Sequence, residues 1–263
     1  NINRGDFRWL TDFNISKNKS KVEKINTPDN SFMPSLEGYP VNAIFGIETA
    51  GLDGNGVMQF KNRDGEIVSF TDFYNLQSGV WGDVYSAHSV KEFRSLFKYM
   101  GDADPGLSGG FINRFIYKNI DFSISANFFI NRTVRATPFY NPTRVDPGIN
   151  YSTNMDDVWS LQNVEGVYPR ILKRGMSENH LDMAYQWIDS YDPSRSYDYY
   201  DIWIKKISYV RVNSIRLGYT LDSSILKSKN LSSIRFTVEA RNPFVFGSSY
   251  KGYFDPENYG NIY

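Results

Sequence analysis

The chain lacks cysteine, net charge and long apolar runs, and each absence excludes a class of function. With no cysteine among 263 residues, it has no disulfides, no thiolate metal site and no cysteine nucleophile. Its 29 Lys and Arg residues balance 29 Asp and Glu residues, which argues against a nucleic-acid binder held by phosphate contacts. No run of 18 apolar residues occurs, so no membrane-spanning helix is predicted.

Aromatic residues, by contrast, are abundant. They make up 16% of the chain, with 19 Tyr and 19 Phe, although its mean hydropathy is negative. A polar average with many aromatic residues is typical of a membrane β-barrel, whose lumen and loops are polar and whose rims carry aromatic girdles. It is also typical of a soluble β-protein that binds carbohydrate, so composition leaves both possibilities open.

Residues 120–131 alternate between apolar and polar side chains. The apolar set is Phe122, Ile124, Ala126, Phe128 and Ile130, and the polar set is Asp121, Ser123, Ser125 and Asn127. Period two over about ten residues matches a strand that crosses a bilayer with lipid on one side and water on the other. Strands of soluble sandwiches are usually shorter, about 5–6 residues.

The same pattern predicts further strands at unequal spacing. We expect strands over residues 6–16, 38–49, 109–117, 120–131, 208–221 and 232–244. Ile44 interrupts the polar face of the second, and a slip of phase in the fifth predicts a bulge near Asn213. Residues 50–100 are punctuated by glycine turns, and we expect at most one or two strands there.

One connection is much longer than the others. Residues 131–201 show no clean alternation and contain several prolines; a helix is expected only at 178–188. A structureless loop of this length argues against a compact soluble domain. Short turns at one end of a sheet and long loops at the other are typical of outer-membrane barrels.

Four ordered motifs resemble the SusC/RagA family of TonB-dependent transporters. NISKNKSKV at 14–22 is similar to the family's NfSxNKNKV, and GGFIN at 109–113 with YKNID at 117–121 is similar to GGfxNxfxYKnfd. SYVRVNSIRLGYTL at 208–221 resembles SFLRLKNITLGYTLP, while RNPFVF at 241–246 and YKGYFDPE at 250–257 resemble the ending xQNLFxFTxYKGxDPE. The departures are Pro243 in place of Leu and Asp222 in place of Pro.

This resemblance implies an all-β fold, an antiparallel transmembrane β-barrel of roughly 22 strands with an N-terminal plug. Residues 1–263 would form the C-terminal part of that barrel, with a long external loop at 131–201 and with the plug, the TonB box and the final strand absent. The family implies import of glycans, oligosaccharides or peptides across the cell outer membrane of a Bacteroidetes-like bacterium. It also implies a SusD-like surface lipoprotein and TonB as partners, no cofactor and no enzyme activity. The alternative is a soluble β-sandwich that binds carbohydrate.

The long loop supplies the candidate binding residues. Flat aromatic faces beside polar groups suit sugar rings or a protein partner. The other interpretation is that these rings pack the loop onto itself. The candidates for ligand or partner binding are Trp159, Tyr168, Trp187, Tyr191, Tyr197, Tyr199 and Tyr200.

Two further motifs carry weaker chemistry. Residues 106–110 fit G-x-S-x-G around Ser108, but a nucleophile elbow needs a helix after the serine, and a strand-like run follows here. Residues 53–56 resemble the start of a calcium loop, but Val57 and Asp64 occupy the fifth and twelfth positions. Paired acidic residues such as Asp102 with Asp104 are read as solvated turns. We therefore predict no catalytic residue and no metal site.

Overall fold

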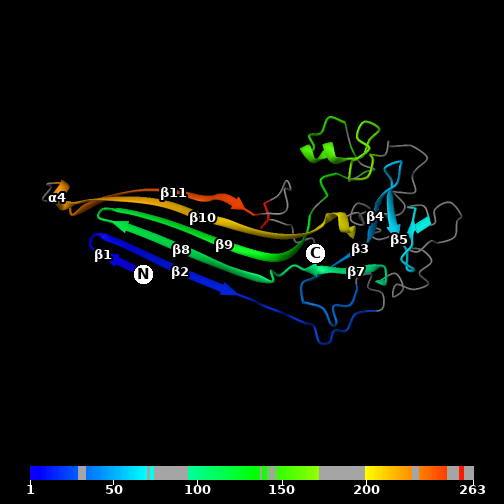
Figure 1. The fold of residues 1–263 in the computed structure, drawn as a ribbon, viewed down its shortest axis with the longest axis horizontal. Helices are drawn as coiled ribbons and strands as arrows, with labels where there is room; N and C mark the ends of the chain where they lie inside the picture. Colours follow the sequence, from blue (N-terminus) through cyan, green and yellow to red (C-terminus); the bar gives the residue numbers. More distant parts are fainter. Residues whose placement is uncertain are drawn as a thin grey trace. The chain divides into compact units, whose positions relative to one another are not determined.

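The computed structural model describes residues 1–28, 34–69, 72–73, 94–136, 138–140, 142, 145, 147–171, 199–226, 231–247 and 255–257. The chain divides into two compact units (Figure 1). Unit 1 comprises residues 1–19, 104–132 and 206–251, and unit 2 comprises residues 20–103, 133–205 and 252–263. The expected helix at 178–188 lies outside the described residues.

Long antiparallel strands dominate unit 1. They form a six-stranded sheet in the order β1-β2-β8-β9-β10-β11 (Figure 1). Between β9 and β10, contacts of Asn119 with Thr220 and of Ser125 with Ser214 run in opposite chain directions, as an antiparallel pair requires. The strands are β1 Ile2–Arg4, β2 Phe7–Ser16, β8 Leu107–Tyr117, β9 Ile120–Arg135, β10 Ile204–Asp222 and β11 Ser233–Phe246.

The registers bring the apolar residues of these strands onto one face. Trp9 pairs with Phe115, which pairs in turn with Phe122, and the rings of Trp9 and Phe115 stack at 5.7 Å. Much of this face is exposed on the outer strands, where Phe13 is 62% and Val238 74% accessible, while Phe122 and Phe128 of β9 are half-buried. An apolar face of this extent is unusual for a water-exposed surface but suits contact with hydrocarbon.

The opposite face of the sheet is polar. Arg114 pairs with Ser123 across β8 and β9, and Arg216 pairs with Glu239 across β10 and β11. Asp121 accepts a hydrogen bond from Arg235 at 2.5 Å in an ion pair between β9 and β11. The predicted two-sided strands are therefore present, and these charged side chains lie opposite the exposed apolar face, although Arg4 of β1 pairs with Phe7 on the apolar side.

The connections at the two ends of this sheet differ sharply in length. At one end, β1 meets β2 at Gly5, β8 meets β9 at Lys118, and the short helix α4, Ser223–Leu226, follows β10. Both Gly5 and Lys118 have a positive φ, as tight turns often require. At the other end, residues 17–106 join β2 to β8, and residues 136–203 join β9 to β10. This asymmetry agrees with the expectation from the sequence.

A bulge interrupts the pairing of β10 with β11. The register shifts between Val212 and Ser214, which confirms the bulge predicted near Asn213. The extra residue lies on β11, however, because Asn242 and Pro243 together oppose Asn213. Asn242 has a φ of 49°, the left-handed conformation common at the first bulge position. Because β10 itself gains no residue, its apolar residues before Asn213 and those after it still lie on opposite faces of the strand.

Unit 2 contains shorter strands in two smaller sheets. β3, Ala43–Ile47, pairs with β7, Phe97–Asp102, and the other sheet orders β4, Thr49–Leu52, β5, Met58–Lys61, and β6, Ile67–Val68. The expectation of one or two strands in residues 50–100 was therefore wrong. Two- and four-residue strands are too short to show a period.

The predicted strand at 38–49 also needs correction. It does not join the long sheet; its residues form β3 and the start of β4 in unit 2. Phe45, Gly46 and Ile47 are buried in succession, so protein covers both faces of β3. The interruption by Ile44 was the sequence sign of this two-sided burial.

Aromatic and aliphatic side chains form the core of unit 2. Phe60 stacks on Phe73 at 4.5 Å and meets Tyr200 edge-on at 5.2 Å. The buried members are Phe45, Ile47, Met58, Phe60, Phe73, Leu96, Phe97, Tyr140, Val158, Tyr200 and Trp203. Among the described residues, no helix combines the length and hydropathy of a membrane span.

Candidate functional site

The structure describes four of the seven aromatic residues proposed for binding. Trp159, Tyr168, Tyr199 and Tyr200 all belong to unit 2. Trp187, Tyr191 and Tyr197 lie outside the described residues. The described four do not form one surface, because they differ in burial and in the elements that hold them.

Tyr200 and Tyr168 pack against the core. Tyr200 is 1% exposed and immediately precedes the 3-10 helix η3, Asp201–Trp203. Tyr168 stacks on Trp203 with ring centroids 5.2 Å apart and meets Phe139 edge-on at 4.9 Å. Burial in this cluster raises the pKa of the Tyr168 hydroxyl, and the nearby Asp157 raises it further. Protein therefore covers the ring of Tyr200, and Trp203 covers one face of the Tyr168 ring.

Tyr199 occupies an intermediate position. Its ring meets Phe97 edge-on at 5.6 Å, and the guanidinium carbon of Arg135 lies 4.5 Å from its centroid. Arg135 also donates a hydrogen bond to the carbonyl of Phe45 at 2.6 Å. These contacts fix Tyr199 between β7 and the end of β9 and use one of its faces for a cation–π contact.

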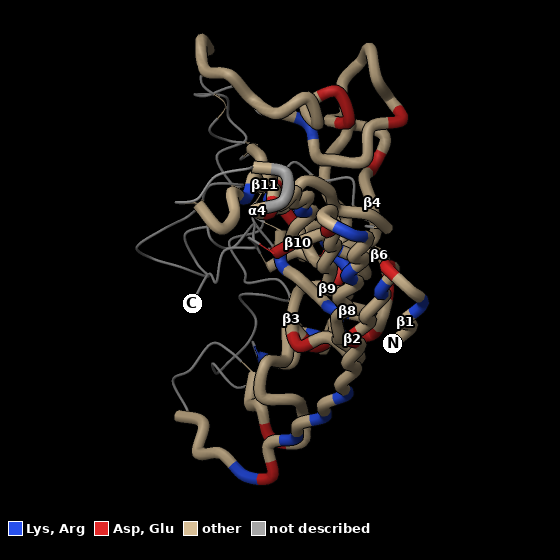
Figure 2. The backbone as a smooth tube through the Cα atoms, turned by 90° about the vertical axis from the view of Figure 1, so that its left-hand side faces the viewer, with Lys and Arg blue, Asp and Glu red and all other residues tan. Residues whose placement is uncertain are grey.

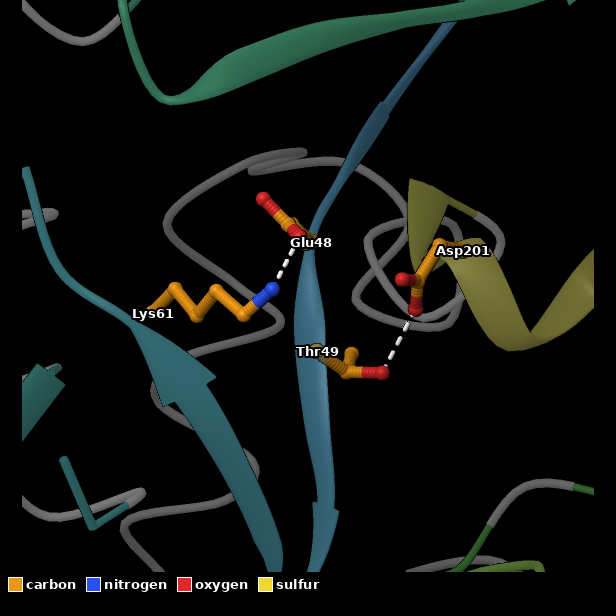
Figure 3. A network of polar contacts seen from close by, with 4 residues as sticks. All are labelled: Glu48, Thr49, Lys61 and Asp201. Atoms are coloured by element: carbon orange, nitrogen blue, oxygen red, sulfur yellow. Dashed lines mark hydrogen bonds and ion pairs between the residues drawn. The ribbon is translucent and has the colours of Figure 1, made fainter. Parts of the chain in front are cut away.

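A polar network holds the segment that contains Tyr199 and Tyr200 against β4 (Figure 3). Thr49 donates a hydrogen bond to Asp201 at 2.5 Å, and Glu48 beside it forms an ion pair with Lys61 of β5. Burial raises the pKa of the Asp201 carboxyl, the bonds from Thr49 partly oppose this effect, and the charge of Glu48 adds to it. The network positions η3, and with it Trp203, in the core.

Trp159 rests on the turn between β4 and β5. A Cβ atom built on Gly56 would lie 2.4 Å from the Trp159 indole, so only glycine leaves room for the ring there. In this turn the Asp53 carboxylate accepts hydrogen bonds from the backbone N–H groups of Asn55 and Val57, both at 2.8 Å. The segment that resembled a calcium loop is thus an Asx turn that supports Trp159.

Residues 158–168 form a small, internally bonded loop. It follows the 3-10 helix η1, Thr153–Asp157, and is closed by a bridge between Val158 and Tyr168. Asn163 exchanges backbone hydrogen bonds with Ser160 at 3.1 and 2.9 Å, and its side chain donates to the carbonyl of Asp156 at 2.8 Å. These hydrogen bonds close the loop on itself.

This loop presents apolar side chains outward. Leu161 is 83% exposed, Val164 62% and Val167 64%, while Trp159 beside them is half-buried. Neighbouring exposed apolar side chains on a structured loop favour contact with a partner. We call Trp159, Leu161, Val164 and Val167 the apolar loop surface. Sequence reasoning found only Trp159, because three aliphatic residues spaced three apart carry no recognisable motif.

The remaining chemical candidates have structural roles. Ser108 lies within strand β8, paired with Ser16 and Phe129, and therefore does not occupy the strand–turn–helix elbow that a G-x-S-x-G nucleophile requires. In the part of the chain that the structure describes, no three His, Cys, Asp or Glu side chains gather as a metal site would need.

Comparison with known proteins decides the family resemblance. No family model matches the chain. The chain is 28% identical to TonB-dependent receptor P3 of Formosa agariphila, over 99% of this chain and 24% of that protein. The resemblance to TonB-dependent receptors is confirmed. The chain spans about a quarter of the length of this curated relative.

Solved structures agree on the fold. The RagAB peptide transporter superposes on 95% of this chain with a TM-score of 0.63, 18% identity and 25% of its own chain covered. The RagAB peptide importer in its open-open state gives a TM-score of 0.61, with 17% identity and 24% of that chain covered. The predicted class is thus confirmed: an antiparallel barrel segment, whose six strands form an open sheet with β1 and β11 at its edges.

Proposed function

We propose that this chain is part of a SusC-like, TonB-dependent importer in the cell outer membrane. The observation that carries the proposal is the long antiparallel sheet of unit 1, apolar and exposed on one face, polar and charged on the other. Such two-sidedness suits a barrel wall between lipid and an aqueous lumen. Likeness to a TonB-dependent receptor supports transport energised through TonB.

The lengths of the connections support an orientation in the membrane. Outer-membrane barrels have short periplasmic turns and longer extracellular loops. The ends of β2, β9 and β11, from which the long connections leave, therefore face the cell exterior. The turns near Gly5 and Lys118 and the helix α4 face the periplasm. In this orientation we propose that the loop predicted at residues 131–201 is external.

The soluble alternative lacks a comparable observation. A β-sandwich buries the apolar face of each sheet against a second sheet. Phe13, Phe236 and Val238 on the apolar face of unit 1 are 62%, 59% and 74% exposed. A carbohydrate-binding sandwich would need a second sheet to cover that face, whereas in a barrel wall lipid covers it.

The substrate is an oligosaccharide or a peptide. The solved structures similar in fold are of a peptide transporter, while the family resemblance also covers glycan importers. Import requires no covalent chemistry, so no catalytic residue is assigned. External loops on a rigid scaffold are the usual place for capture. Trp187, Tyr191 and Tyr197, which lie outside the described residues, remain proposed contacts of substrate or partner.

A SusD-like lipoprotein is the proposed partner, and the apolar loop surface is its proposed contact. A stable lid needs a broad interface of more than about 1,000 Å² in total, and the apolar side chains of Leu161, Val164 and Val167 suit the centre of such a contact. The hydrogen-bonded loop would present them without an ordering penalty on binding.

Replacing two residues of the apolar loop surface should weaken partner capture. In the full-length protein, Leu161→Ser with Val164→Ser should reduce recovery of the lipoprotein in a pull-down at least fivefold and slow growth on the imported nutrient, while membrane insertion stays normal. Both side chains are exposed, so folding should be unaffected.

The matched control is Val41→Ser with Ile67→Ser. These residues are 54% and 62% exposed in the same unit but lie outside residues 158–168. The control should retain full capture. Equal capture by all three proteins, with unchanged growth, would show that the apolar loop surface does not bind the partner.

A further inference from the structure

The polar face of unit 1 is hollowed beside the turn between β8 and β9. The pocket has a volume of about 420 Å³ and is open to solvent. Five side chains of four strands and one turn supply its charge: Arg114, Lys118, Asp121, Arg216 and Arg235. In Figure 2 charges of both signs are interspersed along the chain, so four cations beside one carboxylate are a local excess.

A glycine makes room for the ion pair between Asp121 and Arg235 in this pocket. Asp121 on β9 and Arg235 on β11 are separated by β10, and they meet over Gly218 of that strand. A Cβ atom built on Gly218 would lie 2.4 Å from the Asp121 oxygen and 2.7 Å from the Arg235 guanidinium nitrogen. A side chain at this position would displace one of these two groups, so Gly218 leaves room for a carboxylate held by arginine above β10.

Two other arginines in the pocket lack such a carboxylate. Among the residues that the structure describes, the side chains of Arg114 and Arg216 make no hydrogen bond or ion pair. Arg216 faces Glu239 across the strand pair, but the Glu239 carboxylate is bonded by Arg241 at 3.4 Å. Lys118 forms a long, exposed ion pair with Asp6 at 3.9 Å, and its ammonium lies 5.5 Å from the centroid of the Tyr117 ring. The pocket therefore contains more positive side chains than its one carboxylate, that of Asp121, can neutralise.

We infer that this pocket binds a ligand that carries carboxylates, as a station on the import route. The inference rests on the proposed function, because it places the polar face in the lumen. A guanidinium binds a carboxylate through two parallel hydrogen bonds. Arg114 and Arg216 stand on β8 and β10, with β9 between them, a separation of about 10 Å. That spacing suits a ligand with more than one carboxylate.

Carboxylates can come from an acidic peptide or from an oligosaccharide of uronic acids. The test uses the full-length protein in detergent and isothermal titration calorimetry with N-acetylated triglutamate and with trigalacturonate. Triglutamine and maltotriose are the neutral counterparts. At least one charged probe should bind and both neutral probes should fail, and the charged probe that binds more tightly identifies the source of the carboxylate.

Variants then locate the binding. Arg114→Gln and Arg216→Gln should each weaken the charged probe about tenfold, because each removes a charge-assisted hydrogen-bond pair. Arg8→Gln is the matched control: Arg8 is exposed on the polar face of β2 and does not line the pocket. It should leave the affinity unchanged.

Three results would overturn the inference: no charged probe binds, binding survives both pocket variants, or those variants lower only the unfolding temperature. The last would show that another part of the protein fills the pocket. Membrane insertion and nutrient uptake of the same variants are measured separately. Absence of insertion in the unaltered protein would refute the proposed function, whereas normal insertion and uptake without carboxylate binding would refute the pocket alone.

Discussion

Replacing Phe13 with arginine should destabilise the protein in a bilayer by about 2–4 kcal/mol. Phe13 lies near the middle of β2 on the apolar face, is 62% exposed, and stacks on Phe128 at 6.2 Å. In the proposed barrel it faces hydrocarbon near the midplane, where a guanidinium loses its hydration. The loss is measured by urea unfolding of the full-length protein in lipid vesicles.

The neighbouring residue provides the control. Asn14 is also exposed on β2 but faces the polar side, opposite Gly110, which leaves space for a longer side chain. Asn14→Arg should therefore change the free energy of unfolding by about 0.5 kcal/mol or less. If Phe13→Arg and Asn14→Arg cost the same, the two faces do not meet different solvents and the barrel assignment is wrong.

Trp203→Ala should be the most damaging single change in unit 2. Trp203 is 2% exposed and is packed by Tyr168, Phe139 and Tyr140, with ring centroids 5.2, 5.5 and 6.5 Å from its own. Removing a buried indole forfeits its transfer free energy and leaves a cavity, which together cost about 3–5 kcal/mol.

Proteolysis of the full-length protein in membranes measures this effect. A protease added outside should cleave unit 2 of Trp203→Ala at a denaturant concentration well below that needed for the unaltered protein. Leu161→Ala serves as the control, because its side chain is 83% exposed and should change stability by no more than about 0.5 kcal/mol. Equal protection of Trp203→Ala would contradict the assigned core.

The long strands could be predicted from sequence because each of their faces meets one environment. Residues 120–131 alternate cleanly, and β9 spans Ile120–Arg135 with the expected pairing to β8. The turn at Lys118 and the bulge beside Asn213 were also readable, since each breaks a regular period. Period two carries the most information where one side is uniformly apolar over ten or more residues.

Unit 2 could not be read in this way. Its core joins residues far apart in sequence, such as Phe60 and Tyr200, and its strands are short. No local pattern distinguishes Tyr200, which is buried, from Tyr199, whose ring contacts a cation, although the two are adjacent. Likewise Leu161 and Val164 have ordinary core identities, and only the turn around Asn163 turns them outward.

Spin-label accessibility along β9 tests the central claim most directly. The chain contains no cysteine, so single cysteines at 121–130 can each carry a nitroxide label in the full-length protein reconstituted in liposomes. Collisions with oxygen, which concentrates in lipid, should peak at Phe122, Ile124 and Phe128. Collisions with a water-soluble nickel chelate should peak at Ser123, Ser125 and Asn127. Two profiles that alternate out of phase are the predicted result, and profiles that rise and fall together, or do not alternate, would contradict a barrel wall between lipid and lumen.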